Sequence, residues 1–167
     1  ETGVTSGMRW SVASDVGQIR QRNEDNFLVM PDHHIFAVAD GMGGHASGDL
    51  ASRICVETLF HFFRDDNALK ELEQIWTNAE ASHRQGFPSS DAFIINRAIE
   101  ASNQAIFHTA QTNRHHRSMG TTLVVMKLDG NQLNFGYVGD SRLYRCRGGA
   151  FEQLSYDHSL ANEYLRL

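Results

Sequence analysis

Hydrophobic and polar positions follow two periods along the chain, and the change of period separates strands from helices. Alternation over residues 9–14 predicts a half-buried strand, and a short strand is expected over residues 27–30. The continuous apolar run at residues 35–39 predicts a strand buried on both faces. Asp40 ends this run, and a glycine-rich loop, Gly41-Met42-Gly43-Gly44-His45, is expected to follow it.

Apolar residues then recur at three- and four-residue spacing, which predicts three helices. These are expected over residues 50–63, 69–81 and 91–111, the last with Ser90 as its N-cap. From residue 121 the period returns to that of strands. Hairpins are expected at 121–128/132–138 and at 143–147/150–154, and a last helix near Ser159. Strands, then helices, then hairpins predict an α+β domain rather than alternating βαβ units.

Length and composition narrow the class of protein. The 167 residues suit a single domain, with residues 1–7 expected as a polar tail or an artificial extension and residues 8–167 as the domain. Fifteen Lys and Arg against twenty Asp and Glu give a net charge of −5, which argues against a nucleic-acid binder. No apolar run reaches the roughly 18 residues of a membrane span. Two cysteines favour a reducing compartment, so we expect a cytoplasmic protein without a membrane partner.

Acidic residues gather where the predicted strands begin or end. Glu24 and Asp25 precede one strand, Asp40 closes the next, and Asp140 follows a third. Taken singly, such residues are also typical of turns and caps. Taken together, with no lysine beside them, they indicate hard divalent cations such as Mg²⁺ or Mn²⁺. Arg20 lies four residues before Glu24, and a guanidinium group suits bidentate binding of phosphate.

The glycine-rich loop has an alternative interpretation. Residues 41–46 fit the pattern G-x-G-x-x-A between a strand and a helix, as in dinucleotide-binding turns. Three features argue against nucleotide binding, and one is that the loop lacks the Gly-Lys-Ser/Thr ending of a P-loop. Asp40 would place a negative charge beside the pyrophosphate, and the first predicted helix is followed by another helix instead of a second parallel strand. An oxidoreductase is therefore the weaker hypothesis.

Five ordered motifs resemble the metal-dependent PP2C-type (PPM) protein serine/threonine phosphatases, and in particular their bacterial branch. The resemblance covers the chain from Arg9 onward. The motifs are Gly17-Gln18-Ile19-Arg20-Gln21-Arg22-Asn23-Glu24-Asp25, Val38-Ala39-Asp40-Gly41-Met42-Gly43-Gly44-His45, Ser118-Met119-Gly120-Thr121-Thr122, Val138-Gly139-Asp140-Ser141-Arg142 and Asp157-His158-Ser159.

The resemblance implies a four-layer α-β-β-α sandwich, in which two antiparallel sheets are flanked by helices. It also implies hydrolysis of phosphoserine and phosphothreonine by a metal-activated water, with two or three Mn²⁺ or Mg²⁺ ions. The implied partners are a phosphorylated protein substrate and an opposing Ser/Thr kinase. By motif match, Asp40 would bridge two ions, Gly41 would offer its carbonyl, Glu24 and Asp25 would act through metal-bound waters, Arg20 would hold the substrate phosphate, and Asp140 would help to bind a third ion.

Two departures from the family pattern affect these expectations. Members outside the bacterial branch often carry a histidine, proposed as general acid, where this chain has Met42, and His45 does not match that position. The family's later ligand motifs, a Ser-Asp-Gly segment and an Asp-Asn pair, do not occur before Leu167. We therefore expect the N-terminal two-thirds of a catalytic domain. The alternative hypothesis is a catalytically silent fragment or binding module of that fold.

Overall fold

The computed structural model describes residues 1–5, 7–43, 47–80, 84 and 86–159. Its centre is a five-stranded sheet in which every pair of neighbours is antiparallel. The strand order is β3-β4-β6-β7, with the short β5 paired to the end of β4. The strands are β3 (Asp25–Met30), β4 (Ile35–Met42), β5 (Gly120–Thr121), β6 (Leu123–Asp129) and β7 (Gln132–Val138).

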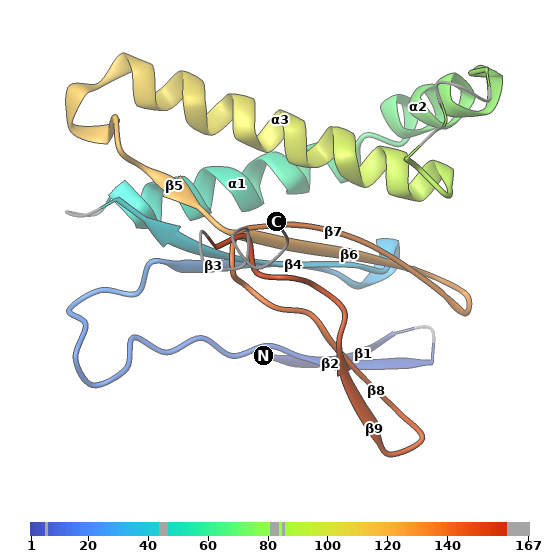
Figure 1. Ribbon diagram of the computed structural model, residues 1–167, viewed down its shortest axis with the longest axis horizontal. Coiled ribbons are helices and arrows are strands. Elements are labelled where there is room, and N and C mark those ends of the chain that lie inside the picture. The colour runs from blue at the N-terminus through green and yellow to red at the C-terminus, as the bar shows by residue number, and fades with distance from the viewer. Residues whose placement is uncertain (6, 44–46, 81–83, 85, 160–167) are drawn as a thin grey trace.

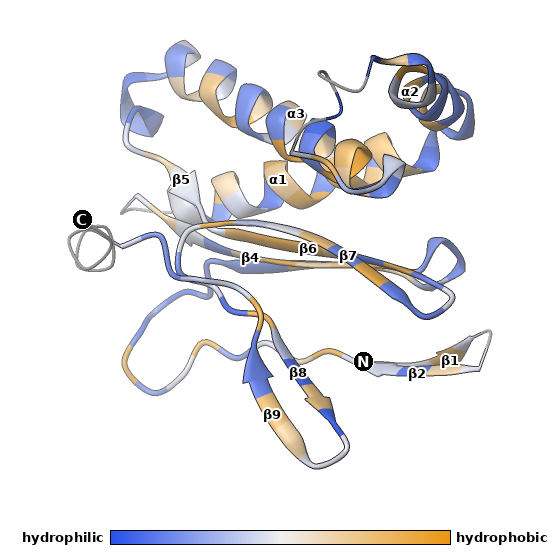
Figure 2. Ribbon diagram, turned by 45° about the vertical axis from the view of Figure 1, so that its right-hand side comes forward, coloured by the Kyte–Doolittle hydropathy of each residue, from blue (hydrophilic) through white to orange (hydrophobic). Residues whose placement is uncertain are grey.

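Three helices cover one face of this sheet (Figure 1). They are α1 (Ser47–Arg64), α2 (Asp66–Asn78) and α3 (Ser90–Thr112), and each matches a helix predicted from the apolar spacing. The core lies between α1, α3 and the sheet, where Leu59, Ile95 and Val125 are almost fully buried. Apolar positions accordingly gather on α1 and on the strands beneath it (Figure 2). Burial of this shared face holds the helical layer on the sheet.

Strand β4 is buried on one face only, so the predicted burial on both faces is wrong. Its alternate residues Ile35, Ala37, Ala39 and Gly41 are buried, whereas Val38 on the opposite face is 45% exposed. The strand also continues through Asp40 to Met42, where β5 pairs with it, instead of giving way to a loop after Ala39. Asp40 therefore lies within a strand, on the face turned away from the helices.

Two hairpins lie on the side of the sheet opposite the helices (Figures 1 and 2). One consists of β1 (Thr2–Thr5) and β2 (Met8–Ser11), and the other of β8 (Tyr144–Arg147) and β9 (Ala150–Gln153). The segment expected as a polar tail thus contains a strand, Thr2–Thr5, which pairs in register with β2. Helices on one side of antiparallel strands and hairpins on the other confirm the α+β class.

Local turns and caps account for the remaining differences between the predicted and observed helices. The N-cap of α3 is Ser89, not Ser90, and its side chain accepts a hydrogen bond from the Ala92 amide. Two short 3₁₀ helices, Pro31–His33 and Arg114–His116, occupy expected connections. The helix expected near Ser159 and the side chain of His45 lie outside the described residues. No helix among the described residues has the length and apolarity to cross a membrane.

Candidate functional site

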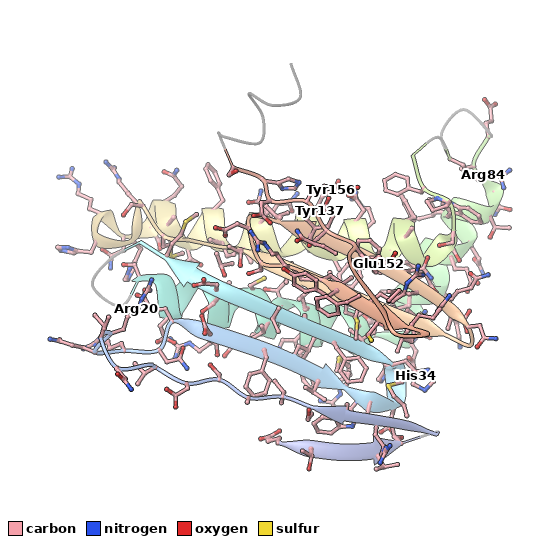
Figure 3. All side chains as sticks on the ribbon, turned by 60° about the horizontal axis from the view of Figure 1, so that its bottom comes forward. Arg20, His34, Arg84, Tyr137, Glu152 and Tyr156 are labelled. Atoms are coloured by element: carbon pink, nitrogen blue, oxygen red, sulfur yellow. The ribbon has the colours of Figure 1, made fainter. Side chains whose placement is uncertain are left out.

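A polar cleft lies at the end of the sheet where β4 ends and β3 begins. It has a volume of about 550 Å³ and is lined by residues 15–20 and 22–25 of the segment before β3, together with Asp40 of β4. Figure 3 shows Arg20 at this end of the sheet and His34 at the opposite end. The structure thus brings Arg20, Glu24, Asp25 and Asp40, all predicted site residues, into one cleft.

Two carboxylates face each other across this cleft. Asp25 pairs with Asp40 in the antiparallel register of β3 and β4, so both side chains project from the same face of the sheet. Partial burial raises the pKa of Asp40 above its ordinary value of 3.8, and the Asp25 carboxylate raises it further. The Arg20 guanidinium acts in the opposite direction, and Asp140 adds a further rise. Asp140 therefore belongs to the same electrostatic cluster.

Arg20 is held loosely at the mouth of the cleft. One of its guanidinium nitrogens lies 3.7 Å from a Glu24 carboxylate oxygen. The Arg20 side chain is 69% exposed, whereas the Glu24 side chain is only 17% exposed. Because an exposed ion pair at this distance is weak, the guanidinium can turn toward an incoming anion at little cost. This arrangement suits bidentate binding of a phosphate group.

Local side-chain hydrogen bonds shape the segment before β3. The side-chain oxygen of Asn23, Oδ1, accepts a hydrogen bond from the Asp25 backbone amide at 3.0 Å. The side-chain nitrogen of Asn23, Nδ2, donates to the Ser14 hydroxyl at 2.6 Å. Such Asx-type turns hold the backbone in a defined conformation where it forms neither helix nor strand. The turn ends at Asp25, the first residue of β3, and so places Asp25 opposite Asp40 near the end of β4.

The backbone beneath the cleft is closely packed around two glycines. The Gly41 amide donates to the Glu24 carbonyl oxygen at 3.1 Å. A Cβ atom on Gly41 would lie 2.0 Å from the carbonyl oxygen of Gly48 in the first turn of α1, so only glycine fits. The buried Ser52 hydroxyl donates to the same Glu24 carbonyl at 2.6 Å. The start of α1 therefore supports both Glu24 and Gly41 from below.

Asp140 follows β7 on a turn that begins with Gly139, whose φ of +96° favours glycine. The next residue, Ser141, makes a 2.6 Å hydroxyl–hydroxyl hydrogen bond with Thr122. Thr122 also accepts a hydrogen bond from the Asp40 amide through its hydroxyl oxygen, at 3.1 Å. The turn that carries Asp140 is thus connected to the strand that carries Asp40.

The chemistry of these groups fits a divalent cation. Asp25, Asp40 and Asp140 offer carboxylate oxygens and Gly41 offers a carbonyl, which are the hard ligands that Mg²⁺ and Mn²⁺ prefer. Like charges directly opposite one another on neighbouring strands are destabilising, and a cation between them removes that cost. Over the part of the chain that the structure describes, no three His, Cys, Asp or Glu side chains are already grouped as a metal cage. The donor types suit such a cation, and two of the carboxylates, Asp25 and Asp40, are cross-strand neighbours.

The sequence reasoning did not identify three supporting residues, namely Gly48, Ser52 and Thr122. Gly48 and Ser52 lie in the first turns of α1, where nothing in the helical pattern separates a supporting residue from an ordinary one. Thr122 is part of a quoted motif, Ser118-Met119-Gly120-Thr121-Thr122, but its partners come from strand β4 and from the turn after β7. Only the fold brings those partners together.

Comparison with known proteins places the chain in a family. The family model described as Protein phosphatase 2C matches residues 18–166. A serine/threonine phosphatase, stp, of Listeria welshimeri is 35% identical over 92% of this chain and 56% of its own length. Protein phosphatase PhpP of Streptococcus pneumoniae is 35% identical over 95% of this chain and 58% of its own. The chain therefore spans a little over half the length of these relatives.

Solved structures agree with the sequence comparisons. The Mycobacterium tuberculosis serine/threonine phosphatase PstP/Ppp superimposes with a TM-score of 0.71 at 30% identity, over 92% of this chain and 56% of that one. The catalytic domain of PstP in complex with two manganese ions gives a TM-score of 0.68 at 29% identity, over 92% and 57% of the two chains. PppA of Pseudomonas aeruginosa gives 0.67 at 36% identity, over 92% and 58%. The α+β sandwich is thus confirmed, and the chain belongs to the protein phosphatase 2C family.

Proposed function

We propose that the protein containing this chain is a metal-dependent serine/threonine phosphatase that hydrolyses phosphoserine and phosphothreonine in proteins. One observation carries the proposal: Arg20 lies in the same cleft as the facing carboxylates Asp25 and Asp40. A cationic clamp beside a carboxylate pair is useful when an anionic substrate must approach a bound cation. Phosphate monoesters have that chemistry, and the relatives are named serine/threonine phosphatases.

In this proposal four residues that line the cleft, Arg20, Glu24, Asp25 and Asp40, act together with the neighbouring Gly41 and Asp140. Asp40 and the Gly41 carbonyl would hold Mn²⁺ or Mg²⁺ directly, Glu24 and Asp25 would hold it through water, and Asp140 would contribute to a third position. When bound, such cations supply Lewis-acid activation of a water molecule as nucleophile. Arg20 would bind the phosphoryl oxygens, orient the phosphorus toward the acidic end of the cleft and stabilise the charge that develops on those oxygens.

The positions of the two cysteines argue against a cysteinyl-phosphate intermediate and are consistent with direct attack by water. Cys55 is buried on α1, and burial raises its pKa to about 11, which disfavours the nucleophilic thiolate. Cys146 is exposed on β8, and neither residue lines the cleft. A water nucleophile needs no such side chain.

We also propose a working metal ion, a cellular role and a compartment for this protein. The manganese in the PstP catalytic domain supports Mn²⁺ as the working ion of this chain, with Mg²⁺ as its substitute. A phosphatase of serine and threonine acts against a protein kinase, so we propose a role in signalling opposite such a kinase. Both cysteines are free thiols, which supports the reducing conditions of the cytoplasm as the working compartment.

The test is release of phosphate from a phosphothreonine peptide by the protein at its natural length. We expect turnover with Mn²⁺, loss of turnover with EDTA, and a large loss of kcat in Asp40→Asn. Asp32→Asn, at the other end of the sheet, is the matched control and should keep full activity. Turnover that persists in EDTA, or that is unchanged in Asp40→Asn, would overturn the proposed function.

A further inference from the structure

We propose that the Thr122 hydroxyl is a positioning group, which fixes the turn bearing Asp140 against the strand bearing Asp40. This inference rests on the proposed function, because it concerns the carboxylates that would bind the cations. Thr122 itself would touch neither cation nor substrate. It would set the distance between the Asp40 and Asp140 carboxylates, to which the cations would bind.

The contacts of Thr122 with β4 fix its own position. Its amide donates to the Asp40 carbonyl oxygen at 2.9 Å, and its hydroxyl oxygen accepts from the Asp40 amide at 3.1 Å. Asp40 is thus bonded through both its backbone groups to one residue. The Thr122 side chain is buried, so water does not compete for its hydroxyl.

The other side of Thr122 contacts the turn that carries Asp140. Its hydroxyl lies 2.6 Å from the Ser141 hydroxyl, a short hydrogen bond next to Asp140 in the chain. Its methyl group packs on Gly139, where an added Cβ would lie 2.7 Å from the Thr122 Cγ2 atom. The Thr122 side chain therefore contacts both neighbours of Asp140 in the chain. Its hydroxyl contacts Ser141, and its methyl group contacts Gly139.

The rest of the turn is anchored elsewhere, which makes the link through Thr122 specific. His158 exchanges two hydrogen bonds with Gly139, through its amide and its Nδ1 atom. Arg142 makes a bidentate pair with Asp157, at 2.8 and 2.6 Å. These contacts tie the turn to the segment after β9, whereas Thr122 ties it to β4. Without the Thr122 hydroxyl, the turn would stay folded while its spacing from Asp40 became less well defined.

Side-chain chemistry separates positioning by the hydroxyl from simple packing. Thr122→Val keeps the volume and removes the hydroxyl, whereas Thr122→Ser keeps the hydroxyl and removes the methyl group. Ser141→Ala removes the far partner and leaves the bond to the Asp40 amide. Thr58→Val on α1 is the matched control, because the Thr58 hydroxyl bonds only the Ile54 carbonyl within its own helix among the interactions of the described residues. Thr58 lies eleven residues beyond the start of α1, or roughly 16 Å along the helix.

The experiment measures Mn²⁺ binding by isothermal titration calorimetry on the natural-length protein and these four variants, with thermal unfolding in EDTA as the measure of folding. We expect Thr122→Val and Ser141→Ala to weaken Mn²⁺ binding by roughly 10-fold, the usual effect of removing a group that orients a ligand. Thr122→Ser and Thr58→Val should bind as the wild type does. Phosphate release at saturating Mn²⁺ should recover most of its wild-type rate in Thr122→Val.

The outcomes separate this inference from the proposed function. Wild-type affinity in a folded Thr122→Val, or equal weakening in Thr122→Ser, would overturn the role of the hydroxyl. A wild type that binds Mn²⁺ without releasing phosphate would overturn the proposed function and leave this inference supported by the affinities. A wild type that binds no Mn²⁺ would overturn both.

Discussion

Asp25 and Asp40 face each other across neighbouring antiparallel strands, on the side of the sheet that the helices leave uncovered. A sheet gains stability from cross-strand pairs of opposite charge or of apolar character, and this pair offers neither. Burial and the neighbouring Asp25 carboxylate both raise the pKa of Asp40. The cleft therefore carries a local cost in folding stability that a bound cation would relieve.

The first prediction is that Asp40→Asn stabilises the metal-free protein while abolishing its response to Mn²⁺. Removing one of two facing charges should raise the free energy of unfolding by about 0.5 kcal/mol at neutral pH. Mn²⁺ should stabilise the wild type in proportion to its binding and leave the variant unchanged. Urea unfolding with EDTA and with Mn²⁺ measures both effects. A variant less stable than the wild type in EDTA would contradict the proposed repulsion.

The first prediction extends to a pH dependence, whose sign follows from the raised pKa of Asp40. Because the pKa of Asp40 lies above its ordinary value of 3.8, the native state holds this proton more tightly than the unfolded state does. The contribution of Asp40 to stability should therefore decline as pH rises from about 3.8 through the raised native pKa. Unfolding curves in EDTA should show this decline in the wild type relative to Asp40→Asn. A constant difference between the two across that range would contradict it.

The second prediction separates substrate binding from cation binding at Arg20. Arg20→Ala should lower kcat/KM for a phosphopeptide by roughly 100-fold, the usual loss when a group that stabilises transition-state charge is removed. Arg20→Lys should recover only part of this loss, because a lysine cannot bind phosphate in a bidentate way. Steady-state kinetics and calorimetry with Mn²⁺ measure the two functions separately.

Mn²⁺ affinity should remain near that of the wild type in both Arg20 variants, because the guanidinium is not a cation ligand. Arg97→Ala on α3, which removes an exposed arginine paired with Glu100, is the matched control and should change neither quantity. Loss of Mn²⁺ binding in Arg20→Ala would show that this arginine maintains the cleft and does not act on the substrate.

The third prediction concerns the reactivity of the two thiols. Burial raises the pKa of Cys55 to about 11, although a hydrogen bond with Ser102 partly offsets the rise, and Cys146 is exposed. In the native protein at pH 8, a thiol reagent such as DTNB should therefore modify Cys146 rapidly and Cys55 only on unfolding. Cys146→Ser should abolish the rapid phase and keep phosphatase activity. A rapid phase that survives in Cys146→Ser would contradict the burial of Cys55.

Hydrophobic periodicity was sufficient to predict the three helices. It failed for the extent and burial of β4, because these depend on the strands and helices beside it. The apolar stripe of α1 can be recognised within a single segment of the chain. The extent of β4, in contrast, depends on β5, which lies about 80 residues away and pairs with Gly41 and Met42. Val38 is apolar yet 45% exposed, because the second face of its strand lacks a helical layer. A run of apolar residues does not show which of its faces a neighbour covers.

In the candidate site, too, the sequence identified individual residues but not their distant partners. Glu24, Asp25 and Asp40 were predicted because acidic residues at strand ends are visible in the sequence itself. That Asp25 lies opposite Asp40 follows from the register of β3 and β4, which the sequence alone does not specify. The supporting hydroxyls of Ser52 and Thr122 bond to backbone groups 28 and 82 residues away, so no local pattern could reveal them.

The fourth prediction is that Gly48→Ala destabilises the protein, against the usual effect of this substitution in a helix. Alanine normally stabilises a helical position by about 1 kcal/mol relative to glycine. Here the new Cβ would lie 2.8 Å from the Gly41 carbonyl carbon and 2.9 Å from the Glu24 carboxyl carbon, so α1 must shift away from β4. We expect a loss of about 1 to 3 kcal/mol in urea unfolding, together with weaker Mn²⁺ binding, because overpacking displaces two candidate ligands. Asn103→Ala, at an exposed position of α3, reports the change in helix propensity alone and should be neutral or stabilising. If Gly48→Ala is as stable as that control and binds Mn²⁺ with wild-type affinity, the close approach of α1 to Gly41 does not support the site.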